Sequence, residues 1–116
     1  MRNLIGLALV SGLIVLASTD ALAASQRGND GSRVYAAACA SCHDTGSDGA
    51  PIMGQPGDWT ARSDLWDAVL LEHVKKGYLN MPAKGGDQGL TEYDAGVAAE
   101  YMLNQSHPAL PRDSAD

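Results

Sequence analysis

Five residues, Cys39-Ala40-Ser41-Cys42-His43, hold both cysteines of the chain and one of its three histidines. Thiol and imidazole groups at this spacing can form a disulfide, bind zinc, act as a redox dithiol or attach a haem. A disulfide between positions this close closes a very short loop and removes little entropy from the unfolded chain. A purely structural bridge is therefore a poor use of the only cysteine pair.

Zinc binding and dithiol redox chemistry both need a setting that the sequence does not provide. A zinc site requires a fourth ligand, and His73 and His107 stand at no motif spacing from the cysteines. A thioredoxin-like dithiol lies at the start of a helix that follows a strand. The cysteine pair falls instead at the end of an expected helix with no strand before it, so both alternatives are weak.

Covalent haem attachment uses every reactive residue of the motif. Two thiols one helical turn apart can each form a thioether with a haem vinyl group, and the adjacent histidine can then ligate the iron. Cys-x-x-Cys-His is the attachment pattern of c-type haem proteins. The sequence therefore predicts one haem c, bound covalently through Cys39 and Cys42, with His43 as an axial ligand.

A methionine is the expected ligand on the other side of the iron. Met81 lies in a segment rich in glycine and proline between two expected helices, where a methionine that only fills the core is less natural. Met53 and Met102 are rivals, but Met53 is close to the motif and Met102 falls on the inner face of a helix. A filled sixth position favours electron transfer, and an open one favours ligand binding or peroxide chemistry.

The first residues of the chain predict export. Arg2 precedes an apolar run of about 14 residues, and Ala21-Leu22-Ala23 supplies the small residues of a cleavage site. A retained membrane anchor is the alternative, but a spanning helix needs roughly 20 apolar residues. We expect 1–23 to be a cleaved signal peptide, the remaining chain not to span a membrane, and the location to be the bacterial periplasm, where haem attachment takes place.

The chain is acidic, with a net charge of −6, and loss of Arg2 and Asp20 with the signal peptide leaves this charge unchanged. Acidic proteins do not favour nucleic acid or anionic membranes. We therefore expect protein redox partners with basic docking patches: a reductase or dehydrogenase as donor and an oxidase or other acceptor. Solubility alone is the alternative reason for the charge.

The spacing of apolar residues predicts an all-α protein with three main helices and long loops. Ser32, Ser63 and Thr91 are expected N-caps, and Gly77 is the expected stop of the second helix. The helices are expected at 32–43, 63–76 and 91–105, and the loops at 44–62 and 78–90. In the last helix the residues expected to face the core are Tyr93, Val97, Ala98, Tyr101 and Met102.

These elements divide the chain into four predicted segments. The signal peptide at 1–23 is followed by a polar, glycine-bearing stretch at 24–31, which we expect to be a flexible lead-in. The folded domain spans 32–105. Pro108 and Pro111 then lead into an acidic tail, so that 106–116 is expected to be flexible.

Several motifs together resemble the cytochrome c5 family of small class I c-type cytochromes, over about residues 32–104. They are Cys39-Ala40-Ser41-Cys42-His43, Gly49-Ala50-Pro51, Asp58-Trp59, Asn80-Met81-Pro82-Ala83-Lys84-Gly85-Gly86 and Tyr101-Met102. The resemblance implies a class I cytochrome c fold, in which three to five helices wrap around one covalently bound haem. One feature departs from the family: members often carry a second cysteine pair where this chain has Asp87-Gln88-Gly89.

The resemblance also implies a role for each site residue. His43 and Met81 would be the axial ligands, and the backbone carbonyl of Pro51 would accept a hydrogen bond from the His43 imidazole. The indole N–H of Trp59 would be a donor near the haem propionates, with a packed core tryptophan as the alternative. The first and last helices should cross near Tyr101.

The sequence therefore predicts a soluble monohaem cytochrome that carries single electrons and is not an enzyme. One alternative is a haem enzyme or gas sensor with a labile sixth ligand. Another is a cytochrome subunit of a larger respiratory or dehydrogenase complex, in which the haem chemistry is the same and only the association differs.

Overall fold

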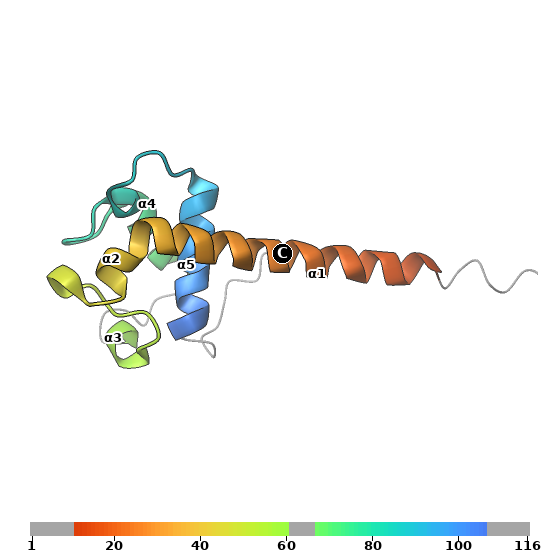
Figure 1. Cartoon of the computed structure of the whole chain (residues 1–116), viewed down its shortest axis with the longest axis horizontal. Coiled ribbons are helices and arrows are strands. Elements are labelled where there is room, and N and C mark those ends of the chain that lie inside the picture. Colours follow the sequence, from red (N-terminus) through yellow and green to blue (C-terminus); the bar gives the residue numbers. More distant parts are fainter. Residues whose placement is uncertain (1–10, 61–66, 107–116) are drawn as a thin grey trace, which may run out of the picture.

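A computed structural model describes residues 11–60 and 67–106 of the chain. Within these ranges the protein is built from helices and loops, with no strand, so the all-α prediction is confirmed (Figure 1). The α-helices are α1 (Ser11–Val34), α2 (Ala40–His43), α3 (Pro56–Thr60), α4 (Asp67–Lys76) and α5 (Glu92–Ser106). No helix among the described residues combines the length and the hydropathy needed to cross a bilayer.

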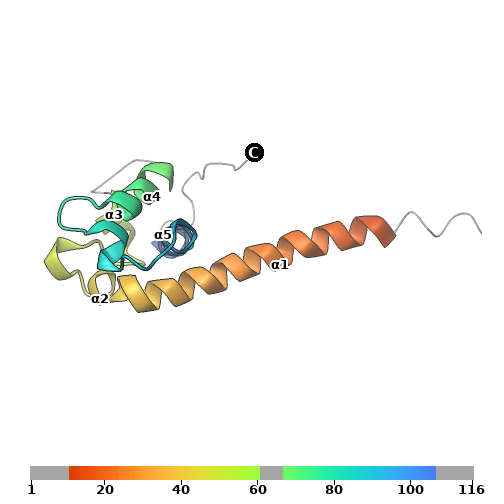
Figure 2. The same cartoon turned by 90° about the horizontal axis from the view of Figure 1, so that it is seen from above.

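Helices α1 and α5 cross at close range (Figure 1), and Figure 2 shows α5 nearly end-on beside α1. A Cβ atom on Gly31 would lie 2.3 Å from the carbonyl oxygen of Val97 and 2.9 Å from Cβ of Tyr101, so glycine is required for this approach. The rings of Tyr35 and Tyr101 pack beside the crossing, with centroids 5.6 Å apart. The predicted crossing of the first and last helices near Tyr101 is therefore confirmed.

Helix α5 lies between two apolar clusters. The first joins it to α1 and the attachment motif, and its buried members are Val34, Tyr35, Cys39, Ala98 and Met102. The second joins it to α4, with Val74, Ala95 and Ala99 buried and with Leu71 and Met81 packed against them. Both the attachment motif and the Met81 loop are thus anchored on α5.

The first helix differs from the prediction at its start but not at its end. Helix α1 runs without a break to Val34, so the lead-in expected at 24–31 is part of a helix. A π-helical turn, Tyr35–Cys39, follows and passes into α2, which ends at His43 as predicted. Glycine and polar residues usually favour a loop, which is why 24–31 was expected to be flexible. Gly31 instead lies within the helix, where its missing side chain allows the close contact with α5.

The expected loops contain short helical turns. Helix α3 begins at Pro56 inside the loop predicted at 44–62, and single 3₁₀ turns occur at Ser47–Gly49 and Ala83–Gly86. Proline is favoured at the first helical position because its missing N–H would have no partner there. Proline also marks loops, so the sequence alone does not separate the two roles. Helix α4 ends at Lys76 with Gly77 at φ +83°, as predicted. Its expected start at Ser63 lies outside the described residues.

The last helix begins with the predicted cap. The Thr91 backbone N–H donates to Asp94 Oδ2 at 2.9 Å, and the Asp94 N–H donates to Thr91 Oγ1 at 3.1 Å. Tyr93 was expected to face the core, which is wrong: it is 48% exposed and its hydroxyl donates to Asp30 on α1. Ser106 was assigned to the tail but closes α5, where its hydroxyl accepts a hydrogen bond from the Gly54 N–H. His107 and the rest of the expected tail lie outside the described residues.

Candidate haem site

The His43 imidazole is buried and held in one orientation. Only 6% of His43 is exposed, and its Nδ1 lies 2.8 Å from the carbonyl oxygen of Pro51. A carbonyl can only accept a hydrogen bond, so Nδ1 carries the proton and donates it. In the neutral imidazole, the other ring nitrogen, Nε2, then keeps a free lone pair. The residue is therefore in the tautomer that a metal-ligating histidine requires.

The two cysteines stand one turn apart and both are free thiols, with Cys39 buried and Cys42 exposed. Burial raises the pKa of the Cys39 thiol, and the neighbouring Cys42 adds to this shift. Cys39 ends the π-helical turn, and Cys42 and His43 close α2. The two thiols and the imidazole needed to hold a haem covalently are thus all present, with neither thiol in a disulfide, on this short stretch.

Trp59 packs directly on the histidine. The two rings are stacked, with centroids 5.9 Å apart and an angle of 17° between their planes. The indole N–H donates to the carbonyl oxygen of Ile52 at 2.9 Å. In the structure this donor is therefore used by the loop backbone, and the role toward a haem propionate that the resemblance implies stays a prediction.

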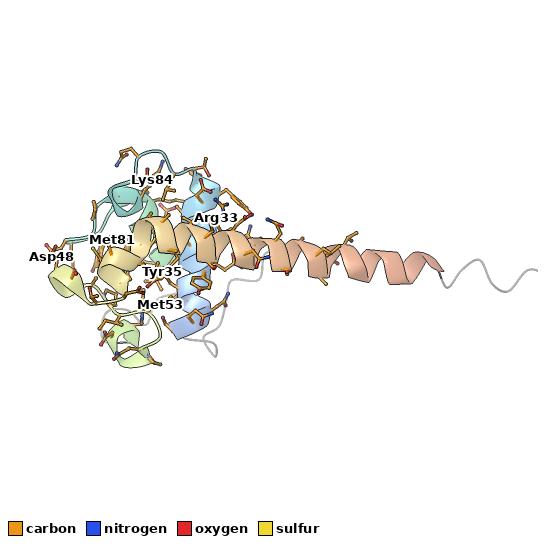
Figure 3. All side chains as sticks on the ribbon, viewed as in Figure 1. Arg33, Tyr35, Asp48, Met53, Met81 and Lys84 are labelled. Atoms are coloured by element: carbon orange, nitrogen blue, oxygen red, sulfur yellow. The ribbon has the colours of Figure 1, made fainter. Side chains whose placement is uncertain are left out.

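Met81 closes a tight turn after α4. Tyr78 and Met81 exchange two backbone hydrogen bonds of 2.9 Å, and Leu79 takes the left-handed conformation with φ +50°. The Met81 side chain is partly buried against the cluster between α4 and α5. In Figure 3, Met81 and Met53 both lie at the end of the molecule that carries α2.

The rival methionines occupy packing positions. Met102 is only 3% exposed and belongs to the buried cluster between α1 and α5. Met53 packs against the edge of the same cluster, and its backbone N–H donates to the His43 carbonyl oxygen at 2.8 Å. Both rivals thus belong to or contact the cluster between α1 and α5, whereas Met81 packs against the cluster between α4 and α5.

Non-covalent contacts bring the Met81 loop to the attachment motif. The Asn80 side-chain amide donates to the backbone oxygen of Asp48 at 3.3 Å. Gly85, with φ +64°, lies so close to the π-helical turn that a Cβ would come within 2.8 Å of the Ala38 carbonyl oxygen. At the base of the loop, the rings of His73 and Tyr78 stack at 3.8 Å. These contacts hold the Met81 loop against the π-helical turn and the loop that follows His43.

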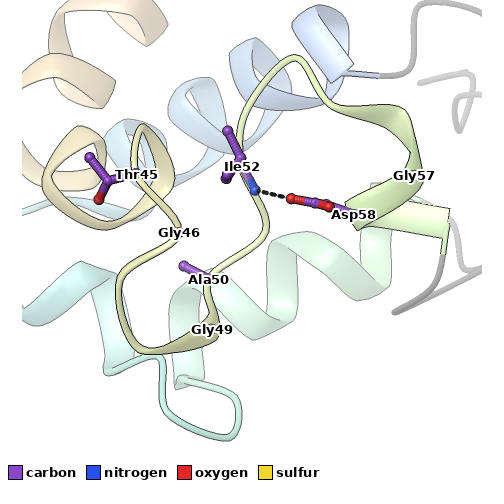
Figure 4. Close-up of a pocket in the computed structure, with 7 residues that line it drawn as sticks. All are labelled: Thr45, Gly46, Gly49, Ala50, Ile52, Gly57 and Asp58. Atoms are coloured by element: carbon purple, nitrogen blue, oxygen red, sulfur yellow. Dashed lines mark hydrogen bonds between the residues drawn. The ribbon is translucent and has the colours of Figure 1, made fainter.

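A hollow of about 530 Å³ adjoins the loop that follows His43 (Figure 4). Its lining residues are Thr45, Gly46, Gly49, Ala50, Ile52, Gly57 and Asp58. Asp58 holds one wall in place, because its carboxylate accepts a hydrogen bond from the Ile52 N–H at 3.0 Å. Neither His43 nor Met81 lines the hollow, so it lies beside the proposed ligands and not between them.

One polar pair next to the motif was missed in the sequence. The Tyr35 hydroxyl donates to the carboxylate of Asp44 across the attachment residues. The available signal was an aromatic residue four positions before Cys39 together with a carboxylate directly after His43.

Comparison with known proteins places these residues in a family context. A family model described as cytochrome c oxidase, cbb3-type, subunit III matches residues 26–102, which include the attachment motif and Met81. A cytochrome c-555 of Chlorobaculum tepidum is 38% identical over 110 residues, 91% of this chain and 99% of the relative. A cytochrome c-555 of Chlorobaculum thiosulfatiphilum is 40% identical over 66% of this chain and 93% of the relative. A cytochrome c-551 of Halorhodospira halochloris is 39% identical over 65% of this chain and 96% of the relative.

Proposed function

Because the chain belongs to the class I c-type cytochromes, we propose that His43 and Met81 are the two axial ligands of its single haem. The protein is a monohaem electron carrier and not an enzyme, and its haem c is held covalently through Cys39 and Cys42. The relatives carry the names c-555 and c-551, so membership in the c5 branch is the finer part of the proposal. It rests on Gly49-Ala50-Pro51 and on the Met-Pro-x-Lys-Gly-Gly segment.

The hydrogen bond from His43 Nδ1 to the Pro51 oxygen carries the proposal, because it leaves Nε2 free to ligate. When bound, the haem iron accepts and donates one electron by changing between the ferric and ferrous states, and a methionine ligand raises its potential. The chain holds each proposed ligand from the backbone: the Pro51 carbonyl orients His43, and two bonds of the 78–81 turn fix Met81. Ligands held in this way need little rearrangement during electron transfer.

The ligand assignment is tested on holoprotein made with haem-attachment machinery. We expect absorption and magnetic circular dichroism spectra of six-coordinate, low-spin iron with a histidine and a methionine ligand. Met81→Ala should lose the methionine signature and bind added imidazole, whereas the matched Met53→Ala should keep the native spectrum. Native iron that is high-spin would refute Met81 as the ligand and favour a haem enzyme or sensor. A Met81→Ala spectrum equal to the native one would also refute Met81 and would point to another methionine as the ligand.

The cellular location of the protein and its redox partners are a second part of the proposal. We place it in the bacterial periplasm, after removal of 1–23, with a donor and an acceptor that present basic docking patches. The acidic charge of −6 and the export pattern of the first residues support this placement. Intact mass of the protein recovered from the periplasm tests it: a chain that begins at Ala24 is expected, and an uncut chain in the membrane fraction would contradict it.

Association with a larger complex is the alternative, and the description of the matching family model favours keeping it. In that case the haem chemistry is unchanged. The native protein should then elute with oxidase or dehydrogenase subunits in mild detergent, whereas a free carrier should elute at the size of its own chain.

A further inference from the structure

A hydrogen bond that the axial ligands do not use spans the attachment motif. Tyr35 lies four residues before Cys39, and Asp44 directly follows His43. The Tyr35 hydroxyl donates to Asp44 Oδ1, so the bond encloses both cysteines and the histidine. A backbone hydrogen bond also ends α2 at Asp44, whose N–H donates to the carbonyl oxygen of Ala40 at 3.0 Å.

The phenol is a fixed donor. Tyr35 is 5% exposed and packs in the cluster between α1 and α5, with its ring against Tyr101. Burial, followed by the bond to Asp44, raises the pKa of the Tyr35 hydroxyl well above its usual range. The hydroxyl therefore stays protonated under ordinary conditions and can only direct its proton at the Asp44 carboxylate.

The carboxylate, in turn, is tied to the histidine by the chain itself. His43 and Asp44 are consecutive residues, and the imidazole is held by its hydrogen bond to the Pro51 carbonyl. A negative charge fixed beside a ligand favours the more positive oxidation state of the metal, and a hydrogen-bond donor to that charge weakens the effect. The two residues therefore act on the iron with opposite signs.

We propose that Asp44 and Tyr35 are positioning residues that together set the reduction potential, with the carboxylate lowering it and the phenol limiting that decrease. The proposal rests on the proposed function, because the carboxylate acts through His43 as an iron ligand.

The test is the midpoint potential of the holoprotein at pH 7. Asp44→Asn, which keeps the shape and an acceptor oxygen but removes the charge, should shift the potential upward. Tyr35→Phe, which keeps the buried ring but removes the donor, should shift it downward by a smaller amount. In the double variant the Tyr35 effect should disappear, because the charge that the phenol compensates is gone.

A second tyrosine–aspartate pair in the same protein supplies the control. Tyr93 donates to Asp30 at 2.9 Å on the outer face of the α1–α5 crossing, away from the motif. Tyr93→Phe should leave the potential unchanged. Unfolding by guanidinium of all four variants measures the structural contribution of each bond separately from its effect on the potential.

The outcomes separate this proposal from the previous one. If the two residues had a purely structural role, Tyr35→Phe and Asp44→Asn would both lower the stability. Both variants would then shift the reduction potential in the same direction or leave it unchanged, and that result would overturn the proposal. If the native spectrum lacks a histidine ligand, the proposed function fails first, before any variant is compared. If that spectrum is as expected and the shifts are not opposite in sign, only the present inference fails.

Discussion

At the scale of single residues, two consecutive carbonyl groups orient the two rings of the site. The Pro51 oxygen accepts from His43 and the Ile52 oxygen accepts from Trp59. The two stacked rings are therefore each hydrogen-bonded to the same short stretch of loop. Asp58 fixes that stretch by accepting from the Ile52 N–H.

The Thr91 cap gives a residue-scale prediction with a pH dependence. The Thr91 N–H and hydroxyl both donate to the Asp94 carboxylate and lower its pKa below the ordinary value. The cap is therefore complete above the unfolded pKa of Asp94, and its contribution is lost as pH falls through the lower, folded value. Thr91→Ala should cost about 1 kcal/mol at pH 7. Guanidinium unfolding at pH 7 and pH 3 checks this, and a cost that does not shrink at pH 3 would contradict it.

The residues of the site were predictable to different extents. Cys39, Cys42 and His43 were predicted from their spacing, because Cys-x-x-Cys-His is the haem-attachment pattern and a zinc site would lack a fourth ligand at motif spacing. The Pro51 hydrogen bond came from family resemblance, since nothing local marks a carbonyl acceptor, and the structure shows that bond. The Tyr35–Asp44 bond was missed, because it depends on how the π-helical turn directs Tyr35, which sequence spacing does not reveal.

At the scale of elements, the crossing of α1 and α5 depends on one glycine. A side chain on Gly31 would meet the Val97 backbone, so Gly31→Ala should force the helices apart and cost about 1–3 kcal/mol. Gly28, on the same helix, is the matched control, because a Cβ there meets nothing within 4 Å. Gly28→Ala should be neutral or stabilising by about 0.5–1 kcal/mol.

Chemical unfolding of the two glycine variants, followed by helix circular dichroism, measures the difference. Equal stabilities of the two variants would show that the crossing tolerates a side chain at Gly31 and would contradict the packing argument.

Helix ends were harder to predict than helix existence. The flexible lead-in expected at 24–31 and the loop expected at 44–62 rested on polar, glycine and proline residues, which mark loops in most sequences. In this chain Gly31 serves a close helix contact and Pro56 opens α3. The end of α2 and the cap of α5 were predictable because they depend on local side-chain chemistry.

At the scale of the whole molecule, four basic side chains among the described residues form ion pairs with carboxylates. Arg27 and Arg33 pair with Glu100 and Asp30, and Lys75 and Lys76 both pair with Glu72. The chain as a whole carries a net charge of −6, so its surface is acidic. Long-range attraction should be felt by cations and by basic partners.

Small charged redox reagents can test the electrostatic effect of this negative charge without the natural partner. Electron exchange with hexaammineruthenium, a cation, should slow as ionic strength rises, because salt screens the attraction over about 8–10 Å. Exchange with ferricyanide, an anion, should become faster over the same range. Rates that are independent of salt with both reagents would contradict a role for the acidic surface in partner binding.

The π-helical turn sets the direction in which α2 presents its side chains relative to those of α1. A π turn accommodates one extra residue in an α-helix, and each residue of an α-helix advances by about 100°. The face that α1 presents to α5 and the face on which α2 carries Cys42 and His43 are therefore offset by the extra residue of the π turn and not by a flexible joint. A deletion of one alanine among Ala36–Ala38 would restore a regular helix and turn the attachment face away from its present direction.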